Sequence, residues 1–252
     1  MKPSIIIIFL ILSLAVQVIP QNKHHDSIKI DKDFYSFWLL EKYYNGLKEG
    51  KTPTMFELEG ALIKDICLPK DSSTVWISSL WEAATVNYVS VSSTEILIPD
   101  AIGITGTMAL RLIEDKGNKY LQLTDSGKTY KFISLQQKYC SVDGLEKYMR
   151  DKFFTGEYYI NNLKDSIVTF QTDGKMDGIQ KFSKFDIMIA AADVPPKINI
   201  VMLRELGRQG YSKPFQWVNE GNKLILNEVI EKGEYREFDK IGDRFVTLTK
   251  IK

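Results

Sequence analysis

The sequence predicts a mainly β protein: an antiparallel meander that closes into a barrel, with one helix near the N-terminus and a second near the middle. Short runs rich in Val, Ile, Thr, Tyr and Phe recur along most of the chain, and these residues suit a pleated, half-buried surface. Turn signals separate several runs at intervals of about 10 residues, the spacing of a meander. The long crossovers that a parallel sheet requires are absent from the sequence pattern. Closure into a barrel then removes unpaired sheet edges.

Residues 1–21 have the pattern of a secretory signal peptide. Lys2 precedes an almost uninterrupted apolar run over residues 5–19, and no further charge occurs before Lys23. A membrane-spanning helix needs roughly 20 apolar residues, so this shorter run favours cleavage. A lipid anchor would need a cysteine directly after the run, and the first cysteine is Cys67. We therefore expect a soluble mature protein, exported to the periplasm or the extracellular space, with no stable membrane anchor.

The charge balance argues against a nucleic-acid partner. Lys and Arg number 33 against 32 Asp and Glu, and removal of the signal peptide takes away only Lys2. The mature chain is therefore close to neutral, whereas nucleic-acid binders show a basic excess or a basic stripe. An aromatic content of 12% provides ample material for a hydrophobic core.

A first helix is predicted over residues 34–47. Apolar residues recur there at spacings of three and four, which places them on one broad face. Gly46 and Gly50 lie near the end of this segment, and Pro53 follows. We expect the helix to cover a sheet with its aromatic face, which consists of Phe34, Phe37, Trp38, Leu40, Tyr43, Tyr44 and Leu47.

A second helix is predicted over residues 141–153, with Ser141 as its N-cap and Asp143 in its first turn. It divides the mature chain into an N-terminal helix-plus-β half, residues 22–140, and a second half, residues 141–252. The two halves form either one large barrel or two joined barrels. The absence of a clear internal repeat slightly favours one joint unit.

The β regions are predicted from alternation and composition, and the turns between them from Gly, Asn and Asp. The predicted strands are residues 74–81, 87–91, 95–98, 109–113, 120–124, 129–135, 157–160, 167–171, 184–190, 199–203, 215–218, 223–229, 235–239 and 244–251. The turn signals are Lys116-Gly117-Asn118, Asp125-Ser126-Gly127, Asp173-Gly174, Glu220-Gly221-Asn222, Lys232-Gly233 and Gly242-Asp243.

The segment Phe153-Phe154-Thr155-Gly156-Glu157-Tyr158 resembles the F-x-G-x-W/Y opening of lipocalin-like, calycin-type barrels. In that family the glycine lets the first strand bend and the aromatic residue closes the barrel end. The resemblance covers residues 153–252, and Tyr158 stands where tryptophan is usual. It implies that Gly156 and Tyr158 close a barrel and that Arg244, late in the chain, lies over Tyr158.

Cys67 and Cys140 are the only cysteines, and their state is left open. Export makes a disulfide plausible, whereas two unpaired thiols are the alternative. The only histidines, His24 and His25, follow the signal peptide in a polar tail, which is a poor place to hold a catalytic or zinc-binding imidazole. We therefore expect no catalytic residue, no metal and no cofactor.

One acidic residue, Asp186, lies in a run of apolar strand residues. It would face either the barrel interior or the solvent at the start of a strand, and we favour the solvent. Pairs of carboxylates at strand spacing also occur, but a carboxylate-dependent hydrolase requires two of them at a defined separation across a cleft.

These observations favour binding over catalysis. A barrel interior lined by aromatic residues would hold a small apolar or amphipathic ligand, and such sites occupy roughly 300 Å³ or more. The alternatives are a secreted carboxylate-dependent hydrolase and an envelope module for protein–protein interaction. The predicted lining residues are Trp76, Tyr88, Phe170, Phe185 and Trp217.

Overall fold

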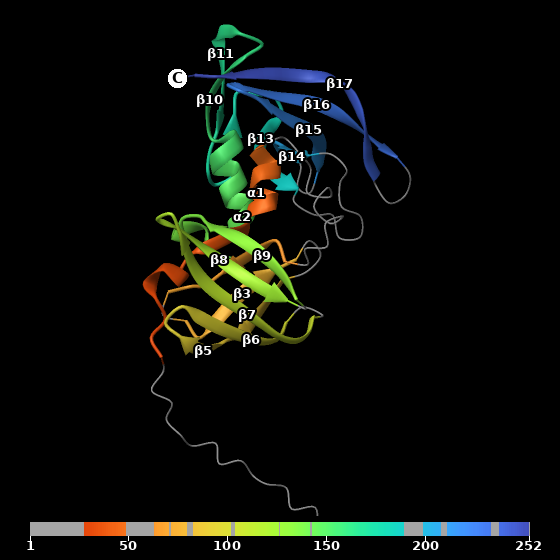
Figure 1. Cartoon of the computed structure of the whole chain (residues 1–252). Helices are drawn as coiled ribbons and strands as arrows, with labels where there is room; N and C mark the ends of the chain where they lie inside the picture. Colours follow the sequence, from red (N-terminus) through yellow and green to blue (C-terminus); the bar gives the residue numbers. More distant parts are fainter. Residues whose placement is uncertain are drawn as a thin grey trace, which may run out of the picture.

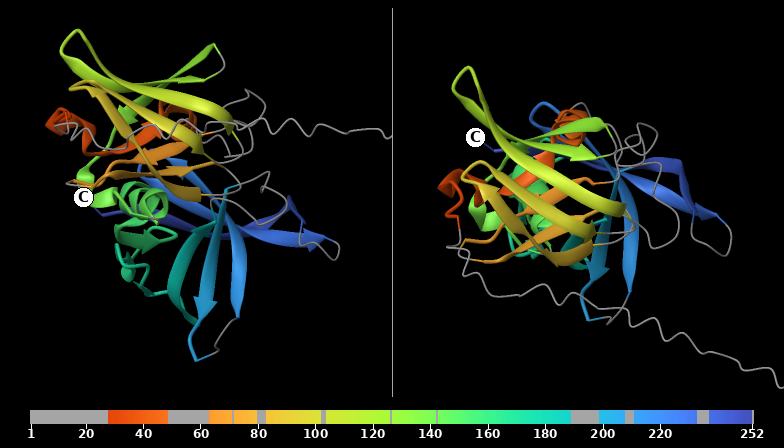
Figure 2. Two further views of the ribbon diagram at one scale, coloured as in Figure 1. Left: turned by 90° about the horizontal axis from the view of Figure 1, so that it is seen from below. Right: turned by 60° about the horizontal axis from the view of Figure 1, so that its bottom comes forward.

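The computed structural model contains two nearly closed antiparallel barrel-like sheets, with the helices α1 and α2 between them (Figure 1). The predicted mainly β fold is therefore confirmed. The two views of Figure 2 also show the sheets as separate bodies of strands. The structure describes residues 28–48, 63–70, 72–79, 83–101, 104–125, 127–141, 143–188, 199–207, 211–232 and 237–251, so the predicted signal peptide and both histidines lie outside the described residues.

The N-terminal sheet, here the N-terminal barrel, has nine strands in the order β4-β3-β2-β1-β9-β8-β7-β6-β5. Its first strand pairs with its last, Leu40 lying opposite Phe132, so the ring is open only between β4 and β5. The strands are β1 Phe37–Leu40, β2 Asp65–Cys67, β3 Thr74–Ser78, β4 Ala83–Asn87, β5 Val89–Ser92, β6 Glu95–Ala101, β7 Ile104–Asp115, β8 Asn118–Asp125 and β9 Lys128–Ser134.

The C-terminal sheet, here the C-terminal barrel, has eight strands in the order β12-β11-β10-β17-β16-β15-β14-β13. Again the first strand pairs with the last, Tyr158 lying opposite Lys250, and an isolated bridge between Lys175 and Lys184 spans the remaining gap. The strands are β10 Gly156–Ile160, β11 Leu163–Phe170, β12 Met176–Asp177, β13 Phe182–Met188, β14 Ile200–Glu205, β15 Ser212–Glu220, β16 Lys223–Lys232 and β17 Glu237–Lys250.

Each half of the chain thus has its own sheet, although the sequence slightly favoured one joint unit. The two sheets share the same ring order without a visible repeat, because a strand needs only a suitable alternation of apolar residues. One buried hydrophobic cluster nevertheless includes residues of both sheets. Tyr44 of α1 and Tyr148 of α2 contribute to the contact between the helices, with ring centroids 6.4 Å apart.

The first helix differs from its prediction. Residues Lys32–Phe34 form a 3-10 turn, Phe37–Leu40 form β1, and only Glu41–Lys48 form the helix α1. All four residues of β1 are buried, because the strand lies between β2 and β9 and is covered on both faces. Periodicity alone does not separate such a short buried strand from a helix.

The second helix is close to its prediction. The helix α2, Gly144–Met149, continues as a π-helical turn over Arg150–Phe154. The N-cap residue is Asp143 and not the predicted Ser141, which lies before the helix; the Ser141 carbonyl accepts a hydrogen bond from the Gly144 amide, and its hydroxyl donates to Asp143.

Three further strands, β2, β4 and the two-residue β12, were missed, and the predicted turn at Gly242-Asp243 lies inside β17. Arg244 pairs with Asn227 and Ile241 with Val229, so β17 contains one more residue than β16 between these pairs. The Gly and Asp therefore mark a β-bulge and not a chain reversal.

Candidate ligand-binding site

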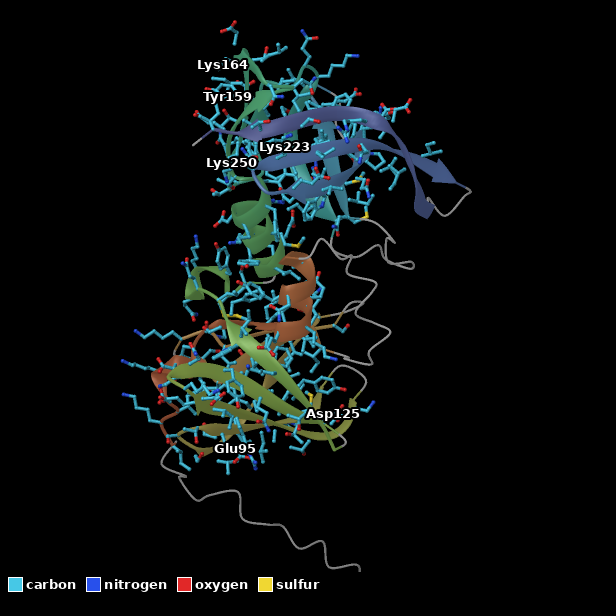
Figure 3. All side chains as sticks on the ribbon, turned by 45° about the horizontal axis from the view of Figure 1, so that its top comes forward. Glu95, Asp125, Tyr159, Lys164, Lys223 and Lys250 are labelled. Carbon is cyan, nitrogen blue, oxygen red and sulfur yellow. A yellow bond between two sulfur atoms is a disulfide. The ribbon has the colours of Figure 1, made fainter. Side chains whose placement is uncertain are left out.

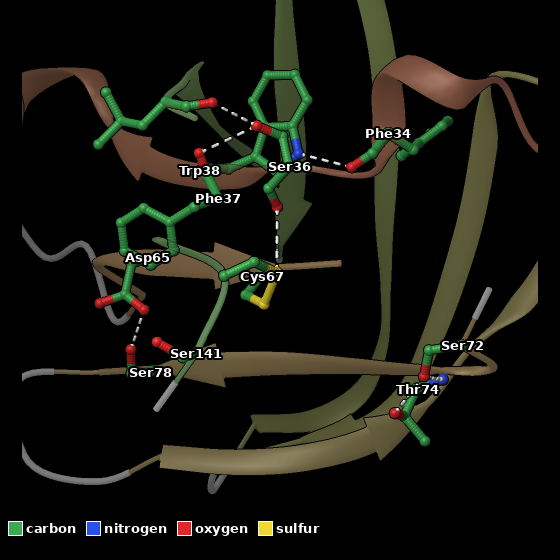
Figure 4. The surroundings of a disulfide bond; sticks show 12 residues. Phe34, Ser36, Phe37, Trp38, Asp65, Cys67, Ser72, Thr74, Ser78 and Ser141 are labelled. Atoms are coloured by element: carbon green, nitrogen blue, oxygen red, sulfur yellow. Dashed lines mark hydrogen bonds between the residues drawn. A yellow bond between two sulfur atoms is a disulfide. The ribbon is translucent and has the colours of Figure 1, made fainter. Parts of the chain in front are cut away.

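A disulfide joins the N-terminal barrel to the segment that leads into α2 (Figure 4). Cys67 lies on β2, and Cys140 follows the 3-10 turn Gln137–Tyr139, with 5.1 Å between the two Cα atoms. Of the two states left open by the sequence, the structure has the bonded one.

Close packing accompanies this bond. A Cβ atom added at Gly144, the first residue of α2, would lie 1.8 Å from the carbonyl oxygen of Tyr139 and 3.2 Å from the ring of Phe37 on β1. The start of α2 is therefore held against the outer face of the N-terminal barrel, and only glycine fits there.

The same outer face carries a buried polar cluster. Asp65 on β2 is only 3% exposed and accepts a hydrogen bond from the Ser78 hydroxyl (Figure 4). The Lys64 amine lies 3.9 Å from the Asp65 carboxylate. Burial raises the pKa of Asp65 to about 6, against the opposing effects of Lys64 and Ser78. Burial, with a smaller contribution from Asp65, also raises the pKa of the fully buried Tyr43 phenol.

Three of the five predicted lining residues come together inside the C-terminal barrel, where they form an aromatic plug. Phe154, at the end of the π-helical turn, has its ring centroid 5.7 Å from Phe170, 5.3 Å from Phe185 and 5.3 Å from Trp217. All four side chains are almost completely buried. At this end of the barrel these rings are packed core.

The other two predicted lining residues belong to the N-terminal barrel. Trp76 lies opposite Cys67 on the outer face of β3. Tyr88 lies between β4 and β5, where its hydroxyl donates to the Ser72 carbonyl at 2.7 Å. The structure therefore does not bring the five aromatic residues into one site.

Gly156 and Tyr158 lie at one end of the C-terminal barrel. Gly156 has φ +137°, a conformation that favours glycine, and a Cβ atom there would lie 3.0 Å from Lys250 Cε. The Tyr158 hydroxyl donates to the Phe154 carbonyl at 2.6 Å. This hydrogen bond links β10, the first strand of the C-terminal barrel, to the π-helical turn that carries Phe154.

Lys250, and not Arg244, lies over Tyr158. The Lys250 amine is 5.7 Å from the centre of the Tyr158 ring, whereas Arg244 pairs with Asn227 on β16. Six positions along a strand correspond to about 20 Å, which is too far for Arg244 to reach. Figure 3 shows Lys250 near Lys223 and Tyr159 on the C-terminal barrel.

A hollow of about 410 Å³ lies on the outer face of the C-terminal barrel. Two methionines of this hollow, Met188 on β13 and Met202 on β14, pack against Ile200 and Val229 and form a small apolar cluster apart from the main core. The lining residues are Asp186, Ile187, Met188, Met202, Arg204 and Ser212.

The polar side of this hollow is an ion-pair network. Asp186 accepts hydrogen bonds from Arg204 Nε and, at 3.2 Å, from Arg150 Nη2, which also pairs with Glu146 of α2. Asp186 therefore lies on the outer face, as the sequence favoured. Ser212 lies opposite Arg204 in the register of β14 and β15. The arrangement places a largely exposed guanidinium and a hydroxyl beside two thioethers.

The sequence missed most of this hollow. Alternation along β13 puts Asp186 and Met188 on one face, but Met202, Arg204 and Ser212 come from strands whose register the sequence does not fix. The one feature of the sequence that indicated the hollow was Asp186, an acidic residue within a run of apolar strand residues.

No protein family, no curated protein and no solved structure matches this chain. The fold alone therefore defines its class, a protein of two antiparallel meander barrels. Within the described ranges, no helix is long and apolar enough to cross a membrane. Those ranges also contain no group of three or more His, Cys, Asp or Glu residues that could hold a metal ion.

Proposed function

We propose that this protein is an exported, soluble and non-catalytic binding protein for a small amphipathic acid. The observation that carries the proposal is the hollow on β13–β15, which combines two methionines with Arg204 and Ser212. Its volume of about 410 Å³ lies within the range of small-molecule sites, roughly 300–1,000 Å³.

The lining residues determine the class of ligand. Met188 and Met202 offer a flexible, polarisable surface that adapts to hydrocarbon chains of different shape. Arg204 has further N–H donors besides the Nε that contacts Asp186, and a guanidinium recognises a carboxylate through paired hydrogen bonds. A carboxylate on Arg204 and Ser212, with an alkyl or aryl part on the methionines, fits this pattern.

The surroundings of the acidic groups favour binding over catalysis. Both carboxylate oxygens of Asp186 accept hydrogen bonds from guanidinium groups of the protein itself, Oδ1 from Arg150 and Oδ2 from Arg204. Asp65 is buried on the other barrel beneath packed side chains.

Export is supported by two features. The signal-peptide pattern of residues 1–21 predicts it, and a disulfide between Cys67 and Cys140 suits an oxidising compartment.

Isothermal titration with hexanoate, octanoate and dodecanoate tests the proposal. We expect affinity to rise with chain length and Arg204→Gln to weaken dodecanoate binding at least tenfold. Arg111→Gln is a matched control, because the Arg111 side chain is 54% exposed, against 56% for Arg204, and is likewise paired through Nε with a carboxylate. Failure of every acid to bind, or equal affinity of both variants, would contradict the proposal.

A further inference from the structure

We infer that the hollow on β13–β15 selects acids that carry a neutral hydrogen-bond donor, a hydroxyl or an amide N–H, on the carbon next to the carboxylate. This inference rests on the proposed function and deepens it, because it assigns Asp186 as the residue that distinguishes one amphipathic acid from another. The ligand class is then a 2-hydroxy fatty acid or an N-acyl amino acid, and a simple fatty acid is a weaker ligand.

Strand register arranges most of the lining in three rows across β13, β14 and β15, which lie side by side (Figure 1). Arg204 and Ser212 form the first row, Asp186 and Met202 the second, and Met188 the third. Neighbouring rows are two residues apart along a strand, which corresponds to about 7 Å. The hollow is therefore polar at one end and apolar at the other, with a carboxylate between the two.

Arg204 and Ser212 can hold the carboxylate of a ligand. Arg204 uses its Nε to donate to Asp186, and its two Nη groups donate to no residue in the part of the chain that the structure describes. The Arg204 side chain is 56% exposed and lines the hollow, so these groups are accessible to a ligand. The Ser212 hydroxyl lies beside them and supplies one more donor.

Asp186 can accept a further hydrogen bond. Its Oδ1 accepts from Arg150 Nη2 at 3.2 Å, and its Oδ2 accepts from Arg204 Nε. A carboxylate has about four acceptor sites, so about two remain. No other group among the described residues donates to them. The Asp186 side chain is 33% exposed and lines the hollow, so a ligand can reach these sites.

The bond between Asp186 and Arg204 determines where the ligand must carry its donor. Because Asp186 accepts directly from Arg204 Nε, a carboxylate bound by the Nη groups of Arg204 lies close to the Asp186 carboxylate. The two negative charges repel each other, which weakens the binding of a simple fatty acid. A hydroxyl or N–H on the adjacent carbon can turn toward Asp186, and a hydrogen bond to a charged acceptor then offsets the repulsion.

The donor should be neutral and not an ammonium group. Asp186 already has two guanidinium partners, Arg150 and Arg204, whose charges would repel a third cation. Lys184 lies opposite Arg204 in the register of β13 and β14 and adds another positive charge. Glu146 pairs with Arg150 from α2, but it does not line the hollow.

Isothermal titration of the full chain with decanoate, 2-hydroxydecanoate, N-octanoylglycine and 2-aminodecanoate tests this inference. We expect 2-hydroxydecanoate and N-octanoylglycine to bind about tenfold more tightly than decanoate, the order of magnitude that one hydrogen bond to a charged group contributes. We expect 2-aminodecanoate to bind more weakly than 2-hydroxydecanoate, because its ammonium group lies among the guanidinium groups.

The substitution Asp186→Ala separates ligand recognition from a structural role. It should abolish the preference for 2-hydroxydecanoate, while decanoate should bind at least as tightly as to the wild type, because the repelling carboxylate is gone and Arg204 Nε is released. Asp186→Asn keeps the shape of the side chain and should reduce the preference in the same direction. Glu95→Ala is the matched control, because Glu95 pairs with Arg111 Nε at 3.0 Å on the N-terminal barrel. Thermal melting verifies that the variants fold.

The outcomes separate this inference from the proposed function. If decanoate binds but neither 2-hydroxydecanoate nor N-octanoylglycine binds more tightly, the inference alone is wrong. Tightest binding of 2-aminodecanoate, a preference that persists in Asp186→Ala, or an equal loss of all four ligands in that variant would also overturn it. If none of the acids binds, the proposed function fails and the inference fails with it.

Discussion

The two barrels have the same order of strands around the ring, but they differ in where side chains pack most closely: on the outer face of the N-terminal barrel and in the interior of the C-terminal barrel. In the N-terminal barrel, the outer face of β1–β3 is buried against helices and the disulfide, and it holds the Asp65 cluster. In the C-terminal barrel, β10 and β11 are buried mainly on one face, and an aromatic plug fills one end of the interior. The same strand order is therefore compatible with a closely packed outer face in one barrel and an aromatic plug in the interior of the other.

This difference explains why the two halves look unlike each other as sequences. A strand that is buried on both faces becomes a continuous apolar run, such as β1, Phe37–Leu40. A strand that is buried on one face alternates, as β13 does. Four predictions test the comparison.

Removal of the plug should have the largest effect. Phe154→Ala should lower the free energy of unfolding by about 4 kcal/mol, because it leaves a large cavity among three aromatic rings. Urea unfolding measures it. Phe154→Leu should cost much less, and Phe245→Ala, at a position 37% exposed, should cost less than about 1 kcal/mol. Equal losses in Phe154→Ala and Phe245→Ala would refute the plug as the main support.

Loss of the disulfide should come second and should act on the other barrel. The double substitution Cys67→Ser and Cys140→Ser should cost about 3 kcal/mol, the middle of the range usually found for the loss of a disulfide. Hydrogen exchange locates the effect, and we expect faster exchange in β2 and β3 than in β15 and β16. Uniform acceleration in both barrels would show that the disulfide supports the whole molecule.

The Asp65 cluster should give the N-terminal barrel a pH dependence of its own. The pKa of Asp65 is about 6 in the folded protein and about 3.8 when unfolded, so the folded state binds the proton more tightly. Protonation of Asp65 therefore stabilises the fold below about pH 4, and this stabilisation is lost as the pH rises through 6.

Asp65→Asn removes this dependence. Between pH 4.5 and 7.5, wild-type protein should lose about 2 kcal/mol relative to the variant. Urea unfolding at several pH values measures the difference, with Asp151→Asn as the control at a partly exposed aspartate. Parallel pH profiles of wild type and Asp65→Asn would exclude Asp65 as the source.

The smallest expected effect concerns the end of the C-terminal barrel. Lys250→Gln removes the cation over Tyr158 and should cost about 0.5 kcal/mol. Arg244→Gln should be neutral, because its side chain is exposed on another part of β17. If thermal melting showed a larger loss of stability in Arg244→Gln than in Lys250→Gln, the role that the lipocalin resemblance implied for Arg244 would be supported.

Composition and turn chemistry were sufficient to predict the fold class and most strands. They failed at β1 because burial on both faces conceals the period of two, and at Gly242-Asp243 because a bulge and a turn use the same residues. Both failures arise from the way a strand pairs with its neighbours, because β1 lies between β2 and β9 and β17 is bulged against β16.

The candidate sites were less predictable. Aromatic side chains occur both in cores and in ligand cavities. The sequence therefore predicted that Phe170, Phe185 and Trp217 lie together, but not that their rings pack against each other and against Phe154. The hollow on β13–β15 depends on strand register, because cross-strand pairing is what brings Met202, Arg204 and Ser212 near Asp186. Local patterns do not contain that information.

The pairing of first with last strands also sets the order of events during synthesis. Leu40 cannot pair with Phe132, nor Tyr158 with Lys250, until the second residue of each pair has been synthesised, about 90 residues later in the chain. Neither ring can close early, so β1 and β10 each keep one edge open while the nascent chain grows. Such high contact order slows folding and exposes strand edges to other chains. The N-terminal barrel can finish while the C-terminal barrel is still being made, and β10 is then the strand that a chaperone would need to protect.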